Sequence, residues 1–156
     1  MRKNGKSPLR NQLFGKEVAN LIGEFQHNMD QKGRITIPAK FRDELGEKFY
    51  VCKGTEKCLF VYSEEKMQQT IERIEALPAA QSNVLRRYFL AGASEADPDK
   101  QGRILIPQNL RDHAGLTKEC VVIGTGSRAE IWDAAEWAAF STADVDMTEI
   151  LKNISL

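Results

Sequence analysis

The sequence is poor in the residues that build metal sites and in the apolar runs that cross membranes. Its 156 residues include three cysteines and two histidines, none at metal-ligand spacing. An odd number of cysteines without such spacing favours reduced, packed thiols, which are typical of a cytosolic protein. The longest apolar runs, such as residues 121–123, are far too short to span a bilayer. These absences argue against a metal-binding protein, a disulfide-stapled secreted domain and a membrane protein.

Signatures of catalysis are missing too. The chain has no G-x-S-x-G elbow, P-loop or dinucleotide fingerprint, and Gly124–Gly126 is more typical of a hairpin turn. His27 and His113 occupy unrelated positions and have no Cys or His partner at ligand spacing. We therefore expect no enzyme, no cofactor, no metal and no small-molecule substrate.

An excess of charge of one sign is also absent. The 22 basic residues equal the 22 acidic residues, which argues against a strongly basic nucleic-acid-binding protein. The distribution is uneven, however. Residues 1–20 hold five basic residues against one acid, a net charge of +4, and residues 129–156 hold six acids against one lysine, a net charge of −5. Any anion-binding face must therefore be local, or be built by assembling several copies.

What the sequence does contain is an internal repeat. Asp30–Asp43 reads DQKGRITIPAKFRD and Asp99–Asp112 reads DKQGRILIPQNLRD, so eight of fourteen positions are identical at an offset of 69. Weaker similarity extends each copy to about 45 residues, 21–65 and 90–135. Such a repeat predicts two related halves, each too small to bury a core alone.

The pattern within each copy is that of β-strands followed by a helix. The alternation in residues 34–37 turns the two isoleucines inward and Arg34 and Thr36 outward, whereas residues 103–106 are apolar on both faces and should be more buried. A proline ends each strand and can open a short helix, over 38–45 and 107–114. Further strands are predicted over 49–52, 59–62, 119–123 and 129–132.

Between and after the copies the apolar period becomes helical. Ser63 and Asp133 are candidate N-caps for helices that follow them. The aromatic residues Phe60, Tyr62, Trp132 and Trp137 are expected in the core or in contacts between subunits. The predicted fold is a β-rich α+β domain, in which two pseudo-symmetric halves interleave into one small β-barrel flanked by helices. We divide the chain into a basic extension (1–20), a first half with the start of a linker helix (21–65), a helical linker (66–89), a second half with a C-terminal helix (90–140) and an acidic tail (141–156).

The repeated turn is the candidate site. Asp30 can accept backbone N–H bonds two residues on, and Gly33 supplies the positive φ that such a turn often needs. The turn would project Arg34 outward with Lys32 beside it. The second copy repeats this set as Asp99, Gly102 and Arg103, with the lysine moved to Lys100.

Two interpretations of the turn stay open from the residues alone. In one, each Asp and Arg simply pair to stabilise a tight loop. In the other, two arginine-bearing loops stand at a symmetric separation and contact DNA. Arginine's planar fork matches the O6 and N7 acceptors of guanine in the major groove, and lysine neutralises phosphate.

Several ordered segments resemble one family. The stretches GEFQHNMDQKGR, ELGEKFYV, CLFVY, DKQGR, ECVVIG and EIW, spread over roughly residues 22–140, are similar to MraZ, a transcriptional regulator family of the bacterial division and cell-wall gene cluster. The resemblance implies two AbrB/SpoVT-type halves in a swapped-hairpin β-barrel. It also implies a ring-shaped homo-oligomer, an octamer or larger, that binds guanine-rich direct repeats in double-stranded promoter DNA. The family's DNA-binding Asp-x-x-x-Arg motif maps onto Asp30 with Arg34 and onto Asp99 with Arg103.

The leading hypothesis is a cytoplasmic, nucleoid-associated repressor. Arg34 would read guanine edges, Lys32 would bind phosphate, and Asp30 and Gly33 would hold the loop. Arg103 and Lys100, on the turn of Asp99 and Gly102, would assist from the other half. The alternatives are an antitoxin-like AbrB-class regulator that binds a toxin through its acidic tail, and a structural ring scaffold that binds no DNA. The first hypothesis expects Arg34 to stand free at the loop tip. Residues 1–20, which precede the resemblance, are either a real basic arm or lie before the true start.

Overall fold

The structure is a computed structural model and describes residues 20–141, 143 and 145–155. The basic extension therefore lies outside the described residues, Asn20 excepted. In chain order the elements are β1 Leu21–Asn28, β2 Arg34–Thr36, α2 Ala39–Leu45, β3 Phe49–Lys53, β4 Leu59–Ser63, α3 Glu64–Glu75, α4 Ala79–Leu85, the π-helix η1 Arg86–Leu90, β5 Ser94–Ala96, β6 Arg103–Leu105, α5 Gln108–Ala114, β7 Glu119–Gly126, β8 Ala129–Asp133, α6 Ala134–Ser141 and α7 Met147–Leu151.

The strands interleave the two copies of the repeat. Six strands form an antiparallel sheet in the order β1-β7-β8-β4-β3-β5. Strand β1 of the first copy pairs with β7 of the second, and β5 of the second pairs with β3 of the first. The two copies meet at the centre, between β4 and β8. Neither copy therefore completes its part of the sheet with its own strands.

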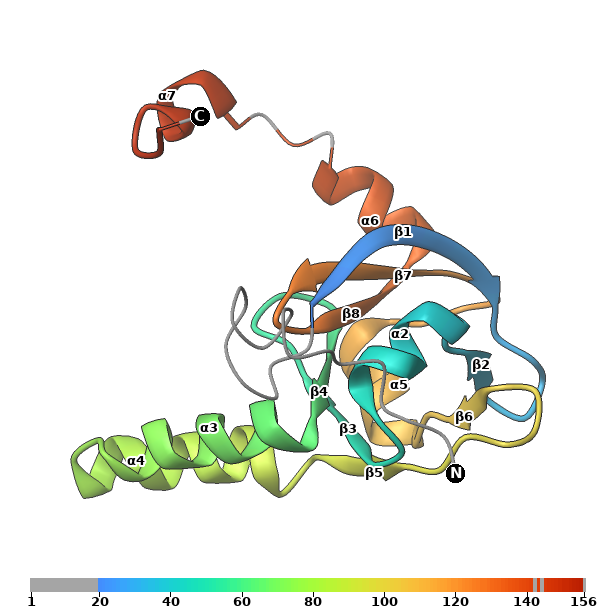
Figure 1. Cartoon of the computed structure of the whole chain (residues 1–156), viewed down its shortest axis with the longest axis horizontal. Helices are drawn as coiled ribbons and strands as arrows, with labels where there is room; N and C mark the ends of the chain where they lie inside the picture. The colour runs from blue at the N-terminus through green and yellow to red at the C-terminus, as the bar shows by residue number, and fades with distance from the viewer. Residues whose placement is uncertain (1–19, 142, 144, 156) are drawn as a thin grey trace.

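A separate two-stranded ribbon, β2 with β6, carries the repeated turns (Figure 1). Ile35 pairs with Ile104, and these are equivalent residues of the two copies. An antiparallel pairing between equivalent residues places a local two-fold axis through that pair. The ribbon thus brings the two repeated segments side by side around one pseudo-symmetry axis.

The α+β class with an antiparallel sheet is confirmed, and the predicted barrel is not settled. Over the described residues, no backbone pairing joins the edge strands β1 and β5 into a closed cylinder. The swapped-hairpin barrel therefore stays a prediction. No helix in the described part of the chain is both long and apolar enough to cross a membrane.

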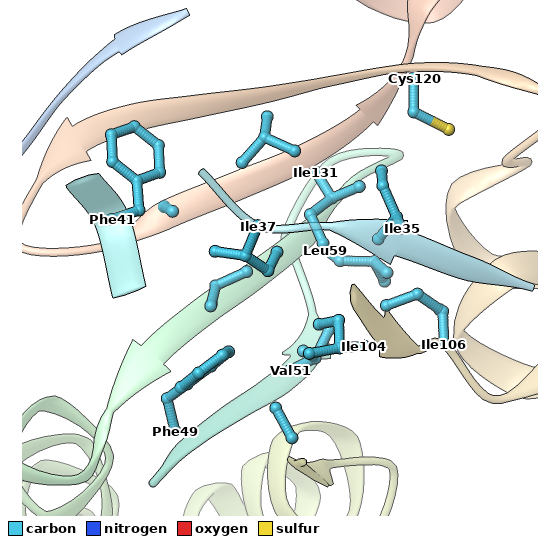
Figure 2. Packing of buried hydrophobic residues seen from close by; sticks show 14 of the residues in the cluster. Ile35, Ile37, Phe41, Phe49, Val51, Leu59, Ile104, Ile106, Cys120 and Ile131 are labelled. Carbon is cyan, nitrogen blue, oxygen red and sulfur yellow. The ribbon is translucent and has the colours of Figure 1, made fainter. Parts of the chain in front are cut away.

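The main core lies between the ribbon, the sheet and the short helices α2 and α5. Figure 2 shows isoleucines of both repeats meeting side chains of the sheet and of α2. The largest buried side chains of this cluster are Phe41, Phe49, Leu21, Ile35, Ile37, Leu59, Ile104, Ile106, Leu110 and Ile131. Pro38 and Pro107 precede α2 and α5, as predicted, because a proline needs no N–H at a helix start. The core thus fixes the roots of both repeated turns.

A second hydrophobic cluster contains the sheet side chains that alternate with those of the main core along the strands. Phe60, Tyr62 and Trp132 are buried there, as expected of core residues, whereas Trp137 of α6 is only half-buried and packs against them. The three cysteines are buried and free, also as predicted. Burial raises the pKa of the Cys52 and Cys58 thiols to about 12, so both stay protonated near neutral pH.

The first helix between the copies, α3, begins directly after Ser63, as the sequence indicated. Ser63 caps α3 by accepting a hydrogen bond from the Lys66 N–H at 3.1 Å. Helices α3 and α4 lie side by side as an arm on the opposite side of the molecule from the ribbon (Figure 1). Because α3 and α4 lie away from the ribbon, substitutions on them should not disturb the repeated turns directly.

One expectation about burial is wrong. Residues 103–106 were expected to be buried on both faces, but Leu105 is 59% exposed. Successive strand residues point to opposite faces, and Ile104 takes the core-facing position at the local axis. Leu105 therefore lies on the outer face of the ribbon, although its side chain is apolar.

Candidate nucleic-acid interface

The first repeated turn is a closed loop built around the carboxylate of Asp30. Its Oδ1 accepts hydrogen bonds from the backbone N–H groups of Lys32 and Arg34, both at 2.9 Å. Its Oδ2 accepts from Nε of Arg34 at 2.7 Å. The Asp30 N–H donates to the Arg34 carbonyl at 2.9 Å, and Gly33, at φ 84°, donates to the Asp30 carbonyl at 3.0 Å. One carboxylate therefore fixes both the turn and the arginine that follows it.

The second turn repeats this geometry. Asp99 Oδ1 accepts from the N–H groups of Gln101 and Arg103, both at 2.9 Å, and Oδ2 accepts from Arg103 Nε at 2.8 Å. Gly102 has φ 79° and donates to the Asp99 carbonyl at 2.9 Å. Because two separate sequences reach the same arrangement, the Asp-x-x-Gly-Arg pattern itself specifies the loop.

The two loops adjoin one another. Arg103 Nη1 lies 3.9 Å from Oδ2 of Asp30, so the arginine of one turn approaches the carboxylate of the other. On the outer face of the ribbon, Arg34 is paired with Leu105 and Arg103 with Thr36. The structure therefore brings both predicted arginines to one surface, on either side of the pseudo-two-fold axis.

The expectation that Arg34 stands free is only partly met. Its Nε is bound to Asp30, and its side chain is 31% exposed; the Arg103 side chain is 32% exposed. Within the described residues, Arg34 donates to Asp30 through its backbone N–H and its Nε, and no hydrogen bond uses its terminal amino groups. The arginine is thus oriented by its aspartate without being sequestered. A guanidinium held this way keeps two N–H-bearing nitrogens for a ligand.

The carboxylates stay ionised in this arrangement. The N–H of Arg34 lowers the pKa of Asp30 below its ordinary value of 3.8, and the Arg34 side chain adds to the effect. The N–H of Arg103 likewise lowers the pKa of Asp99. Near neutral pH each loop therefore contains a charged pair, and the exposed lysines Lys32 and Lys100 add positive charge beside it.

Each predicted site residue has a place in the turns. Gly33 and Gly102 are buried inside them, where the backbone has positive φ, which suits glycine. Two residues of the same face, Thr36 and Leu105, were not predicted as part of the site. The alternation of the first copy carried the signal for Thr36, which was predicted to face outward. Leu105 gave no such signal, since an exposed leucine looks like a core residue in sequence.

The described residues contain no group of three or more His, Cys, Asp or Glu side chains placed to hold a metal ion. The polar chemistry of the site is therefore that of two arginines, two carboxylates and two lysines at the edge of a pseudo-symmetric ribbon. These features define a two-repeat α+β protein with paired Asp-x-x-x-Arg loops.

Comparison with known proteins identifies the family. A family model described as "MraZ protein, putative antitoxin-like" matches twice, over residues 21–87 and 89–153. The protein named transcriptional regulator MraZ of Caldanaerobacter subterraneus subsp. tengcongensis is 46% identical over 137 residues, which cover 86% of this chain and 96% of the relative. Its namesake in Acetivibrio thermocellus is 50% identical over 121 residues, which cover 76% of this chain and 85% of that protein. The chain belongs to the MraZ family.

Among solved structures, the chain matches one titled "The solution structure of PHS018 from pyrococcus horikoshii". It is 21% identical and covers 72% of this chain and 88% of its own, with a TM-score of 0.29. A likeness this low carries no argument about the fold.

Proposed function

We propose that this protein is a sequence-specific DNA-binding transcriptional repressor, in which the β2–β6 ribbon enters the major groove. The observation that carries the proposal is the pair of aspartate-oriented arginines, Arg34 and Arg103, on one exposed surface. A two-stranded ribbon fits the major groove, and arginine can donate to both O6 and N7 of guanine. The names of the relatives, transcriptional regulators, support the same class of function.

The other site residues have roles that follow from their positions. Lys32 and Lys100 are exposed beside the arginines and would neutralise phosphates. Asp30 and Asp99, with the glycines of their turns, hold the arginines in place before DNA arrives. Side chains that are ordered in advance lose less conformational entropy on binding. The carboxylates therefore lower the cost of recognition, although they have the same sign of charge as DNA.

A balanced net charge favours binding by several copies. One subunit offers two arginine loops, and its 22 acidic residues offset its 22 basic ones. We propose a ring-shaped homo-oligomer, an octamer or larger, whose subunits engage successive guanine-rich repeats in promoter DNA. When several weakly binding subunits are linked in one assembly, the overall affinity for DNA rises although each subunit makes the same contacts.

The proposed target is the division and cell-wall gene cluster, so the protein would be cytoplasmic and nucleoid-associated. The swapped-hairpin barrel would be the fold of each subunit.

A gel-shift assay on the DNA upstream of the protein's own gene tests this function. Arg34→Ala should lose about 1–3 kcal/mol for each base contact, and Arg103→Ala should also weaken the complex. The matched control is Arg73→Ala, which removes an exposed arginine of α3, away from the ribbon. Light scattering on the same samples reports whether the assembly persists. Equal binding by all three variants and the parent protein would rule out the ribbon as the DNA-binding surface.

A second candidate function comes from the description of the family model, which includes the term antitoxin-like. In the tail, α7 has exposed apolar side chains beside acidic ones, namely Met147, Ile150 and Leu151 near Asp146 and Glu149. Such a segment suits a basic, partly apolar partner protein. Recovery of a small toxin with the full chain, lost on deleting residues 145–156, would favour this function. Recovery of the chain alone as an assembly that shifts promoter DNA would exclude it.

A further inference from the structure

Each copy of the repeat contains a second arginine, which takes no part in the turn hydrogen bonds described above. Arg42 in α2 and Arg111 in α5 are equivalent in the two copies, and both are half-buried. Neither belongs to the Asp-x-x-x-Arg motif. Both arginines nevertheless contact the two repeated turns, which hold Arg34 and Arg103.

Each of these arginines lies against the turn glycine of the other copy. A Cβ atom built on Gly102 would stand 2.6 Å from Cζ and from Nε of Arg42. A Cβ atom built on Gly33 would stand 2.8 Å from Cζ and from Nη1 of Arg111. The guanidinium groups therefore pack directly on the glycines, in space that any other residue would occupy. Glycine is therefore required at these two positions for two reasons, the positive φ and the lack of room for a Cβ atom.

Hydrogen bonds across the axis complete the arrangement on one side. The Ile37 N–H donates to the Gly102 carbonyl at 2.9 Å, and Arg42 Nε donates to the Ile37 carbonyl at 3.0 Å. Arg42 is thus tied to the strand end that itself holds the second turn.

On the other side, the Ile106 N–H donates to the Gly33 carbonyl at 2.9 Å. Here Nε of Arg111 is buried and has no hydrogen-bond partner among the described residues. Arg111 therefore contacts the first turn by packing of its guanidinium and not through a hydrogen bond from Nε.

We propose that Arg42 and Arg111 are positioning residues that act across the pseudo-two-fold axis. Arg111 holds the turn that orients Arg34, and Arg42 holds the turn that orients Arg103. A planar guanidinium can stack on a peptide unit, which a compact ammonium cannot. The bracing itself is a property of the fold, and its consequence for recognition rests on the proposed DNA-binding function.

Amide hydrogen exchange on the full chain tests the crossed pattern without DNA. The reporters are the turn amides of Lys32, Gly33 and Arg34 in the first copy and of Gln101, Gly102 and Arg103 in the second. Arg111→Met should speed exchange of the first set by about tenfold and leave the second set unchanged. Arg42→Met should do the reverse.

Two results would overturn the proposal. One is faster exchange in the turn of the mutated arginine's own copy, and the other is an equal increase in both turns. If a Met variant does not fold, Arg111→Lys and Arg42→Lys are compared instead. Lysine keeps the charge and the aliphatic stem but not the planar fork, so the same crossed pattern is expected at smaller amplitude.

A double-mutant cycle on upstream promoter DNA tests the consequence for recognition. The loss caused by Arg34→Ala should shrink in the Arg111→Met background and stay full in the Arg42→Met background. The reverse assignment would contradict the proposal. If Arg34→Ala leaves DNA binding intact in every background, the proposed DNA-binding function fails, while the exchange pattern still decides the bracing.

Discussion

At the scale of single residues, the aspartate of each turn controls how its arginine is presented. Asp30 uses one oxygen for the backbone of the turn and the other for Nε of Arg34. The arginine therefore has one fixed nitrogen and two terminal ones. The ion pair of the first interpretation is therefore present, and it also orients the guanidinium that the second interpretation assigns to DNA.

Substituting Asp30 with Asn separates these two effects. The amide oxygen can still accept from the turn N–H groups, but its NH₂ group faces Nε of Arg34, and two donors cannot bond. We expect a folded protein that binds promoter DNA several-fold more weakly. Thermal unfolding followed by circular dichroism checks the fold, and fluorescence anisotropy checks DNA binding. Binding equal to the parent protein's would show that orientation of Arg34 by Asp30 is irrelevant.

The same carboxylates define a pH dependence. Their pKa values are lower in the folded protein than the ordinary 3.8, so they contribute stability above that pH and lose it as the pH falls through the folded values. Because neither carboxylate changes its protonation between about pH 5 and 8, we expect their titration to leave turn geometry and DNA affinity unchanged over that range. NMR titration of the turn amides measures this. A midpoint between pH 5 and 7 at the Arg34 amide would contradict it.

At the scale of elements, the β2–β6 ribbon has one face for the core and one for solvent. Ile104 is 1% exposed and lies on the local axis, whereas its neighbour Leu105 is 59% exposed. Replacing Ile104 with Ala should cost about 2–5 kcal/mol of unfolding free energy, whereas Leu105→Ala should stay within about 0.5 kcal/mol. Urea denaturation of both variants measures the difference. Similar losses would mean that the ribbon's outer face is covered.

Some features of the ribbon and of the short helices were predictable from the sequence, and others were not. The alternation of residues 34–37 and the prolines at 38 and 107 predicted the strands and the short helices to within a residue, because each signal depends on local backbone chemistry. The exposure of Leu105 could not be predicted, since pairing across the axis decides which face is buried. The contact of Arg111 with Gly33 could not be predicted either, because it joins residues of the two copies that no local sequence pattern connects.

At the scale of the whole molecule, the interleaved sheet makes the two halves depend on one another. Strand β1 has its hydrogen-bonded neighbour in the second copy, and β5 has its neighbour in the first. A separated half would leave strand edges unpaired and much of the shared core exposed. The copies are therefore parts of one cooperative unit, although the sequence reads as a tandem repeat.

Expressing the halves as separate chains tests this interdependence. Residues 21–87 or 89–153 alone should be largely unfolded, and mixing them should restore the far-ultraviolet circular dichroism spectrum of the intact chain. The intact chain is the control. A cooperative thermal transition in either isolated half, at the midpoint of the parent protein, would contradict the interleaved pairing.

Methylation interference on the upstream promoter fragment asks whether the ribbon reads guanine edges in the major groove. Methylation of guanine N7 removes the acceptor that an arginine fork requires. If Arg34 and Arg103 bind guanine, N7 methylation within the promoter repeats should block the complex, and Arg34→Ala together with Arg103→Ala should remove this pattern. Full binding to N7-methylated repeats would contradict this role.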